Sequence, residues 1–146
     1  MSAESQPRVS LTEHEQHELL SRARLAMENS HSPYSSFRVG AALRSADGVV
    51  WSGCNVENAS FGLTVCAERT ALVKAVSEGV REFDAVAIVT DGSKPTMPCG
   101  ACRQALAEFC ADELIVVVES ASKKLIVSTL GALLPRSFRP SDLHEA

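Results

Sequence analysis

Helical and extended patterns alternate along the second half of the chain, and this order most constrains the fold. Residues 65–78 have helical spacing and end at Gly79, a favourable helix C-cap. Residues 86–90 and 114–119 have the apolar pattern of buried strands, and residues 99–109 between them are predicted to be helical. A helix that connects two strands predicts an α/β domain in which helices pack on a sheet with parallel core strands.

The first half of the chain predicts one helix and one hairpin. Capping-box patterns that begin at Ser10 and at Thr12 precede a helical pattern over residues 12–28. Residues 39–44 and 49–55 are extended runs separated by an Asp-Gly turn, which predicts a β-hairpin.

Composition excludes several classes of protein. A chain of 146 residues with 45% hydrophobic residues predicts one domain, residues 1–146, in which the polar residues 1–9 form a flexible arm. The 14 basic and 18 acidic residues give a net charge of −4, which disfavours nucleic-acid binding through a basic face. No run reaches the roughly 18 apolar residues of a membrane helix, and the first residues lack the apolar core of a secretion signal. We therefore expect a cytoplasmic protein that binds neither membranes nor nucleic acid.

The cysteines indicate metal binding or catalysis. Thiols in a chain without an export signal stay reduced, so an odd number of them favours these roles over disulfides. The chain has five, at positions 54, 66, 99, 102 and 110.

The pair Cys99 and Cys102 lies at the start of a predicted helix, where two thiols three residues apart point to the same side. Unpaired N–H groups at a helix N-terminus lower thiol pKa values and favour the thiolate that zinc binds. By itself the pair fits a redox centre and half of a structural zinc site about equally. The other cysteines occur singly, which favours three protein ligands with one open position, and Cys54 and Cys110 are expected to be packing thiols.

Residues 66–69 supply the remaining parts of such a site. Cys66 is a third ligand at the start of another predicted helix, and Glu68 follows two residues later. Most helix glutamates are solvated, but a carboxylate beside a metal can take a proton from water and give it to a leaving amine. Three thiolates around Zn²⁺ leave a net negative charge, and Arg69 is the candidate cation to offset it, unless it forms an ordinary surface ion pair.

Cys-x-Glu followed by Pro-Cys-x-x-Cys after a strand is similar to the zinc deaminase signature in its all-thiolate form. The segments around these motifs resemble the short, single-domain cytidine deaminases over about residues 12–140. The resemblance implies a three-layer αβα domain with a mixed five-stranded sheet. The segments that carry it are YSSFRVGAAL at 34–43, NVENA at 55–59, CAERTA at 66–71 and PCGACRQ at 98–104.

The resemblance also implies an activity, the hydrolytic deamination of cytidine and 2′-deoxycytidine to the uracil nucleosides and ammonia, as in pyrimidine salvage. Glu68 would move the protons beside one Zn²⁺ per chain. The zinc ligands would be Cys66, Cys99 and Cys102.

Further roles are implied for the substrate contacts. Asn55 and Glu57 would hydrogen-bond the ribose 3′-hydroxyl, Phe37 would pack on the pyrimidine, and the Ala67 backbone would contact the base. Phe138, in a segment similar to the family's C-terminal one, would reach the active site of a neighbouring subunit and so implies a homotetramer. Without the resemblance, Asn55 and Glu57 would be ordinary turn residues and Phe37 a core residue.

One position departs from the family pattern, and three other functions stay open. Phe61 stands where relatives commonly carry Tyr, which removes a hydroxyl contact there. The chain could deaminate another aminopyrimidine, such as a nucleoside antibiotic, with different sugar contacts. It could also be a non-enzymatic zinc module with four filled ligand positions, or a thiol redox protein that needs no metal.

Overall fold

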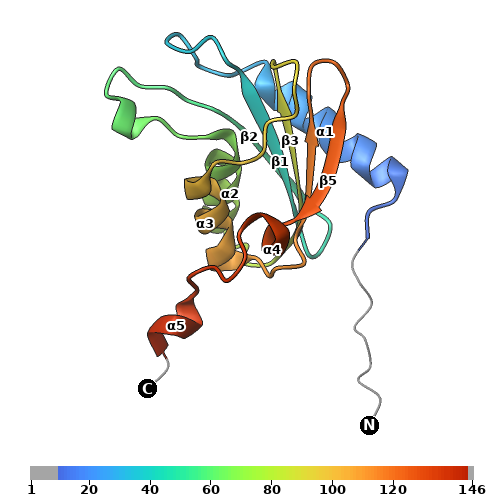
Figure 1. Cartoon of the computed structure of the whole chain (residues 1–146), viewed down its shortest axis with the longest axis vertical. Coiled ribbons are helices and arrows are strands. Elements are labelled where there is room, and N and C mark those ends of the chain that lie inside the picture. The colour runs from blue at the N-terminus through green and yellow to red at the C-terminus, as the bar shows by residue number, and fades with distance from the viewer. Residues whose placement is uncertain (1–9, 145–146) are drawn as a thin grey trace.

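The computed structural model describes residues 10–144, and the predicted arm at residues 1–9 lies outside that range. Five strands form one sheet, and helices lie on both of its sides (Figure 1). The elements in chain order are α1 Glu13–Met27, β1 Val39–Ser45, β2 Val50–Cys54, η1 Phe61–Leu63, α2 Ala67–Ser77, β3 Phe83–Thr90, α3 Gly100–Phe109, β4 Ile115–Glu119, β5 Leu125–Thr129, α4 Leu130–Leu133 and α5 Pro140–His144.

The sheet is mixed, with strand order β2-β1-β3-β4-β5. The pairs β1/β2, β1/β3 and β4/β5 are antiparallel, whereas β3 and β4, which α3 connects, are parallel. The hairpin and the parallel core pair were both predicted from the sequence, and the structure confirms them.

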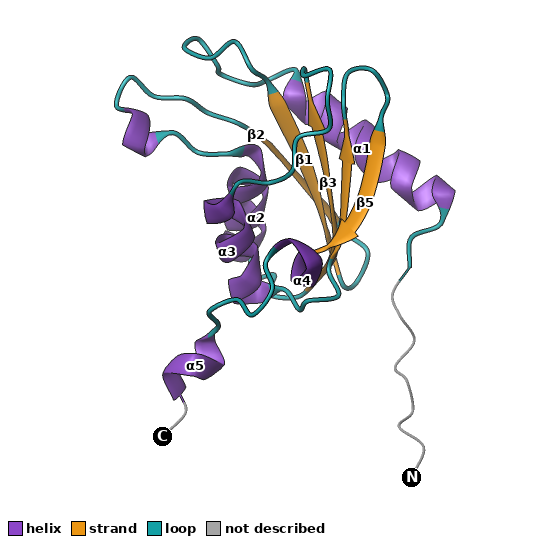
Figure 2. Ribbon diagram, in the orientation of Figure 1, coloured by secondary structure: helices purple, strands orange, loops and turns teal. Residues whose placement is uncertain are grey.

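Side chains of the central strands alternate between two apolar cores, as the pleat of a strand requires. Leu43 and Ile88 point to the core under α2 and α3, whereas Ala42 and Ala87 point to the core under α1. Figure 2 shows α1 behind the sheet and α2 and α3 on its other side. The predicted three-layer α/β arrangement is thereby confirmed.

Helix α1 begins at the second of the two capping boxes predicted from the sequence. Thr12 Oγ1 accepts a hydrogen bond from Glu15 N at 3.1 Å, and Glu15 Oε1 accepts one from Thr12 N at 3.1 Å. The helix then lies so close to β1 that a Cβ at Gly40 would be 1.9 Å from Ala23 O. Only glycine therefore lets this layer pack against the sheet.

Some boundaries differ from those expected. Strand β3 begins at Phe83, three residues before the predicted start at residue 86, because β1 extends to Ser45 and pairs with it. The pattern did not predict β5, whose residues are mostly exposed at the edge of the sheet. Within residues 10–144, no helix combines the length and apolar character needed to cross a membrane.

Candidate active site

The N-termini of α2 and α3 meet at one end of the helical layer, and each begins at a cysteine. Cys66 is the N-cap residue of α2 and Cys99 that of α3, both with extended backbone angles. Cys102 lies in the first turn of α3 and is buried. Unpaired backbone N–H groups at both helix ends favour negative charge here. Two segments more than 30 residues apart thus bring three thiols together.

The spacing of these three sulfur atoms fits a tetrahedral zinc ion. Cys66 Sγ and Cys99 Sγ are 3.8 Å apart, Cys99 Sγ and Cys102 Sγ are 3.4 Å apart, and all three lie within 4.8 Å of one another. Zinc–sulfur bonds of about 2.3 Å at tetrahedral angles would place sulfur atoms about 3.8 Å apart. We call this cluster the sulfur triad; Cys54 and Cys110 lie outside it within the described part of the chain.

Arg69 lies beside the sulfur triad, as predicted. Its Nη2 is 3.7 Å from Cys66 Sγ and 3.4 Å from Thr64 O. Hydrogen bonding to Cys102 and then to Arg69 lowers the pKa of Cys66 to about 5. The contact with Cys66, followed by burial, raises the pKa of Cys102, so of these two thiols Cys66 ionises first.

Glu68 is buried beside the sulfur triad. Its side chain is only 5% exposed, although it lies in the first turn of α2, where a glutamate is commonly solvated. Burial raises the pKa of this carboxyl above its ordinary value, and the negative charge of Cys66 adds to the effect. A buried carboxyl whose pKa is raised, beside a cluster of possible metal ligands, is a candidate for proton transfer.

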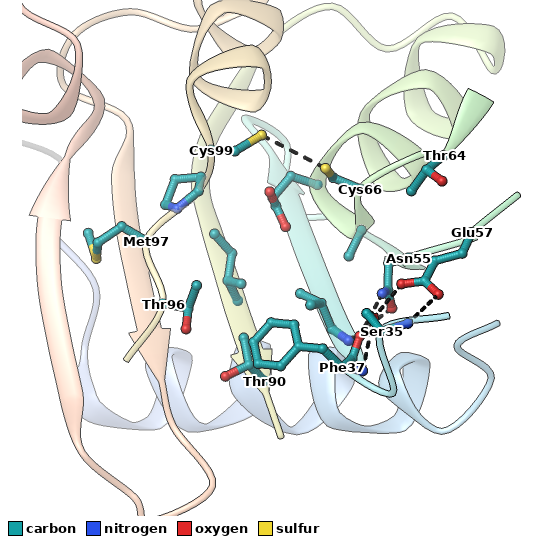
Figure 3. A pocket seen from close by; sticks show the side chains of 15 residues that line it. Ser35, Phe37, Asn55, Glu57, Thr64, Cys66, Thr90, Thr96, Met97 and Cys99 are labelled. Atoms are coloured by element: carbon teal, nitrogen blue, oxygen red, sulfur yellow. Dashed lines mark hydrogen bonds between the residues drawn. The ribbon is translucent and has the colours of Figure 1, made fainter. Parts of the chain in front are cut away.

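A cavity of about 250 Å³ opens at the sulfur triad. It contains five of the residues predicted from the sequence to contact substrate or move protons, namely Phe37, Asn55, Glu57, Ala67 and Glu68, together with Cys66 and Cys99 (Figure 3). No substrate contact was predicted for the other lining residues, although Ser35, Val39 and Pro98 stand in segments that carry the family resemblance. These other residues are Ser35, Val39, Thr64, Ile88, Thr90, Thr96, Met97 and Pro98.

The two predicted sugar contacts already have partners within the chain. Asn55 Nδ2 donates to Phe37 O at 2.8 Å, while Asn55 Oδ1 accepts from Val39 N at 2.9 Å and from Ser30. One amide hydrogen of Asn55 is left to donate. Glu57 accepts from the backbone of residues 34 and 35, and a hydrogen bond from the Ser35 hydroxyl lowers its pKa, so it is held as a carboxylate that can accept further hydrogen bonds.

Two aromatic residues singled out from the sequence lie away from the cavity of their own chain. Phe138 is 58% exposed, and its carbonyl accepts a hydrogen bond from Gln104 Nε2 at 2.7 Å. Phe61 is also exposed, and its ring packs edge-on against Tyr34 with centroids 5.8 Å apart. Neither side chain lines the cavity, so any contact of Phe138 with a substrate requires a second chain.

Known proteins are similar to this chain in sequence and in fold. Residues 13–118 match the family model of the cytidine and deoxycytidylate deaminase zinc-binding region. A cytidine deaminase of Sporosarcina psychrophila is 46% identical over 128 residues, which are 88% of this chain and 94% of that protein. The 1.6 Å crystal structure of cytidine deaminase from Burkholderia pseudomallei superposes with a TM-score of 0.82 at 47% identity, over 88% of this chain and 100% of that one.

A blasticidin-S deaminase of Bacillus cereus is less similar, at 33% identity over 108 residues, which are 68% of this chain and 76% of that protein. The zinc-binding region of the family includes all three cysteines of the sulfur triad, which is consistent with one Zn²⁺ per chain. The sulfur triad, the buried carboxyl and these similarities agree: the chain belongs to the cytidine deaminase family of zinc-binding enzymes.

Proposed function

We propose that the chain works as a single catalytic domain that hydrolyses cytidine and 2′-deoxycytidine to uridine and 2′-deoxyuridine with release of ammonia. One observation carries the proposal: a cavity of about 250 Å³ is lined by the buried carboxyl of Glu68 and by two thiols of the sulfur triad, those of Cys66 and Cys99. A structural zinc module has no use for a cavity or a buried acid beside its ligands. The names of the most similar relatives support the same substrate class.

Zinc would be held by Cys66, Cys99 and Cys102, whose sulfur spacing fits a tetrahedral ion. When bound, the ion supplies Lewis-acid chemistry that makes water a nucleophile near neutral pH. Arg69 would offset the excess negative charge of three thiolates, because its guanidinium already lies 3.7 Å from Cys66 Sγ.

Glu68 would move the protons. It accepts one from the attacking water as the oxygen adds to C4 of the pyrimidine, and it delivers this proton to N3. It then transfers the proton of the new hydroxyl to the 4-amino group, which leaves as ammonia while C4 becomes a carbonyl. Burial raises the pKa of Glu68 above its ordinary value, which makes the carboxylate a stronger base for the first transfer.

The remaining cavity residues would hold the nucleoside. Phe37 would pack on the pyrimidine and the Ala67 backbone would contact the base, since both line the cavity next to Glu68. Glu57 would accept from the 3′-hydroxyl of the sugar, and Asn55 would donate its remaining amide hydrogen. Phe61 would contribute no hydroxyl, and its contact with Tyr34 is apolar.

The assembly that we propose is a homotetramer in which Phe138 enters the cavity of a neighbouring subunit. Phe138 is 58% exposed, and Phe61, Leu63 and Val73 are each at least 60% exposed. Apolar side chains in this number favour burial against another copy. Light scattering after gel filtration tests the assembly, and Phe138→Ala should raise KM; a monomer with full activity would contradict it.

We also propose that the enzyme works in the cytoplasm. Three thiols within 4.8 Å of one another would oxidise readily outside a reducing compartment, and zinc needs all three as thiolates. Fractionation of the producing cells tests this location.

Loss of the cytidine absorbance band, with and without a zinc chelator, tests the reaction. Turnover that stops with the chelator and returns with zinc supports the proposal, whereas turnover of a disulfide without metal would indicate a redox protein. Rates across a panel that includes blasticidin S distinguish cytidine from other aminopyrimidine nucleosides, a class to which one relative points. If the zinc-loaded protein deaminates none of these nucleosides, the remaining interpretation is a structural zinc module.

A further inference from the structure

The segment of residues 34–37, here called the rim turn, begins in the turn at residues 33–35 and forms one edge of the cavity (Figure 3). Ser35 and Phe37 of this turn line the cavity directly. Between them, Ser36 has a φ of 56°, in the left-handed region that residues other than glycine rarely adopt. A backbone of this kind persists where the surrounding contacts hold it in place. The contacts that hold the rim turn therefore decide where the Phe37 ring lies.

Ser35 makes the central contact of the rim turn. Its hydroxyl donates to Glu57 Oε2 and accepts a hydrogen bond from Phe37 N at 3.0 Å. A serine hydroxyl has one donor and can accept at the same time, so one atom satisfies both neighbours. The backbone N–H groups of Tyr34 and Ser35 donate to Glu57 Oε1 at 2.9 and 3.2 Å. Ser35 is thus bonded to the proposed sugar contact and to the residue that carries the proposed base contact.

We propose that Ser35 is a positioning residue that couples recognition of the sugar to recognition of the pyrimidine, because its hydroxyl fixes Glu57 and the backbone of Phe37 together. This inference rests on the proposed function of the cavity. A hydroxyl of the substrate that binds Glu57 then binds a carboxylate whose two oxygens are already oriented. The same interaction holds the rim turn that presents the Phe37 ring to the base.

The other bonds to this segment do not replace the link through Ser35. Asn55 holds Phe37 O and Val39 N, and the Asp91 carboxylate pairs with Arg38 at 2.8 Å. These bonds hold the segment at and after Phe37, toward the start of β1. The side before it is held by the bond from Ser36 N to Ser32 O and by the two backbone bonds to Glu57 Oε1, which do not need the Ser35 hydroxyl. Removal of that hydroxyl should therefore free Glu57 Oε2 and the N–H of Phe37.

Steady-state kinetics of four proteins test the proposal: wild type, Ser35→Ala, Ser35→Thr and Ser32→Ala. Ser35→Ala should raise KM for cytidine about tenfold with little change in kcat, as expected when a charge-assisted hydrogen bond that orients a binding group is lost. Ser35→Thr keeps the hydroxyl and should behave like wild type. Ser32 lies on the same loop and contributes only its carbonyl to a bond with Ser36 N in the described part of the chain, so Ser32→Ala is the matched control.

A second substrate separates coupling from general damage. With 2′,3′-dideoxycytidine, which lacks the 3′-hydroxyl, the KM penalty of Ser35→Ala should shrink, because the interaction that Ser35 orients is absent. An unchanged KM in Ser35→Ala, equal damage in Ser35→Thr, or the same penalty with both nucleosides would overturn the proposal.

Binding of uridine, measured by calorimetry, provides a readout that does not depend on turnover. Ser35→Ala should weaken uridine binding by a factor similar to the change in KM. If the zinc-loaded wild type binds uridine but does not deaminate cytidine, the proposed function fails, while the effect of Ser35→Ala on uridine binding still decides the role of Ser35. An equal Kd in both proteins would refute that role.

Discussion

Glu68→Gln is the substitution that most directly tests the chemistry. Glutamine keeps the shape and volume of the side chain, so packing around this 5% exposed position should be almost unchanged. An amide is neither a proton acceptor nor a proton donor of useful strength near neutral pH, and the carboxyl that it replaces is proposed to serve two proton transfers. The substitution therefore removes both transfers at once.

Its expected magnitude follows from those two steps. Each general acid–base step contributes about 10²- to 10⁴-fold, so loss of both should lower kcat at least about 10⁴-fold, equivalent to about 5 kcal/mol in the barrier. The free energy of unfolding should stay the same or rise, because burial raises the pKa of Glu68 and a neutral amide avoids the cost of a buried charge.

The assay is the decrease in cytidine absorbance at saturating substrate, with zinc content measured on the same samples. Glu108→Gln is the matched control, since Glu108 is an exposed glutamate on α3 and its substitution should leave kcat unchanged. A Glu68→Gln enzyme that holds one zinc per chain and retains more than a tenth of the wild-type kcat would refute the assignment.

The remaining predictions concern the metal and the packing of the layers. Cys99→Ala should lose both zinc and thermal stability, measured by metal analysis and melting, and full zinc occupancy would contradict its role. In the metal-free protein, alkylation of Cys66 should increase with pH around a midpoint near 5, since its pKa is lowered to about 5 and only the thiolate reacts. Arg69→Gln should move that midpoint to higher pH, and an unchanged midpoint would show that Arg69 does not lower the pKa of Cys66. Gly40→Ala should destabilise the fold by about 1–3 kcal/mol or more in denaturant, because its Cβ would overlap α1, whereas Gly62→Ala, where a Cβ meets nothing within 4 Å, should be neutral.

The parts of the fold that were predictable are those with local signals. The capping box at Thr12, the Asp-Gly turn of the hairpin and the helix over residues 100–109 depend on neighbours a few residues apart. Strand β5 has no such signal, because a short, exposed edge strand lacks the alternation that burial imposes. The start of β3 depends on pairing with β1, which is about 40 residues away in the sequence.

In the candidate active site too, features with local sequence signals were predictable and contacts between distant residues were not. Three thiols, a glutamate and an arginine near two helix starts were predictable, because helix N-termini and thiol spacing are local features. The contacts of Glu57 with the rim turn were not, since the interacting residues are 22 and 23 positions apart and no motif links them. The side chain of Asn55 is buried and makes three hydrogen bonds within the chain, so it also stabilises the fold. The sequence, in which Asn55 resembles an ordinary turn residue, did not predict these bonds.

The burial of Cys102 behind Cys66 and Cys99 has a consequence for metal exchange. Only the latter two belong to the cavity wall, so an ion held by the three thiolates would be reached from the opening through which a nucleoside would enter. A bound nucleoside would then block access to the metal as well as being the reactant. Chelators should accordingly remove zinc faster from the ligand-free enzyme than from the enzyme with bound product. In cells that lack pyrimidine nucleosides, the protein would lose zinc most easily.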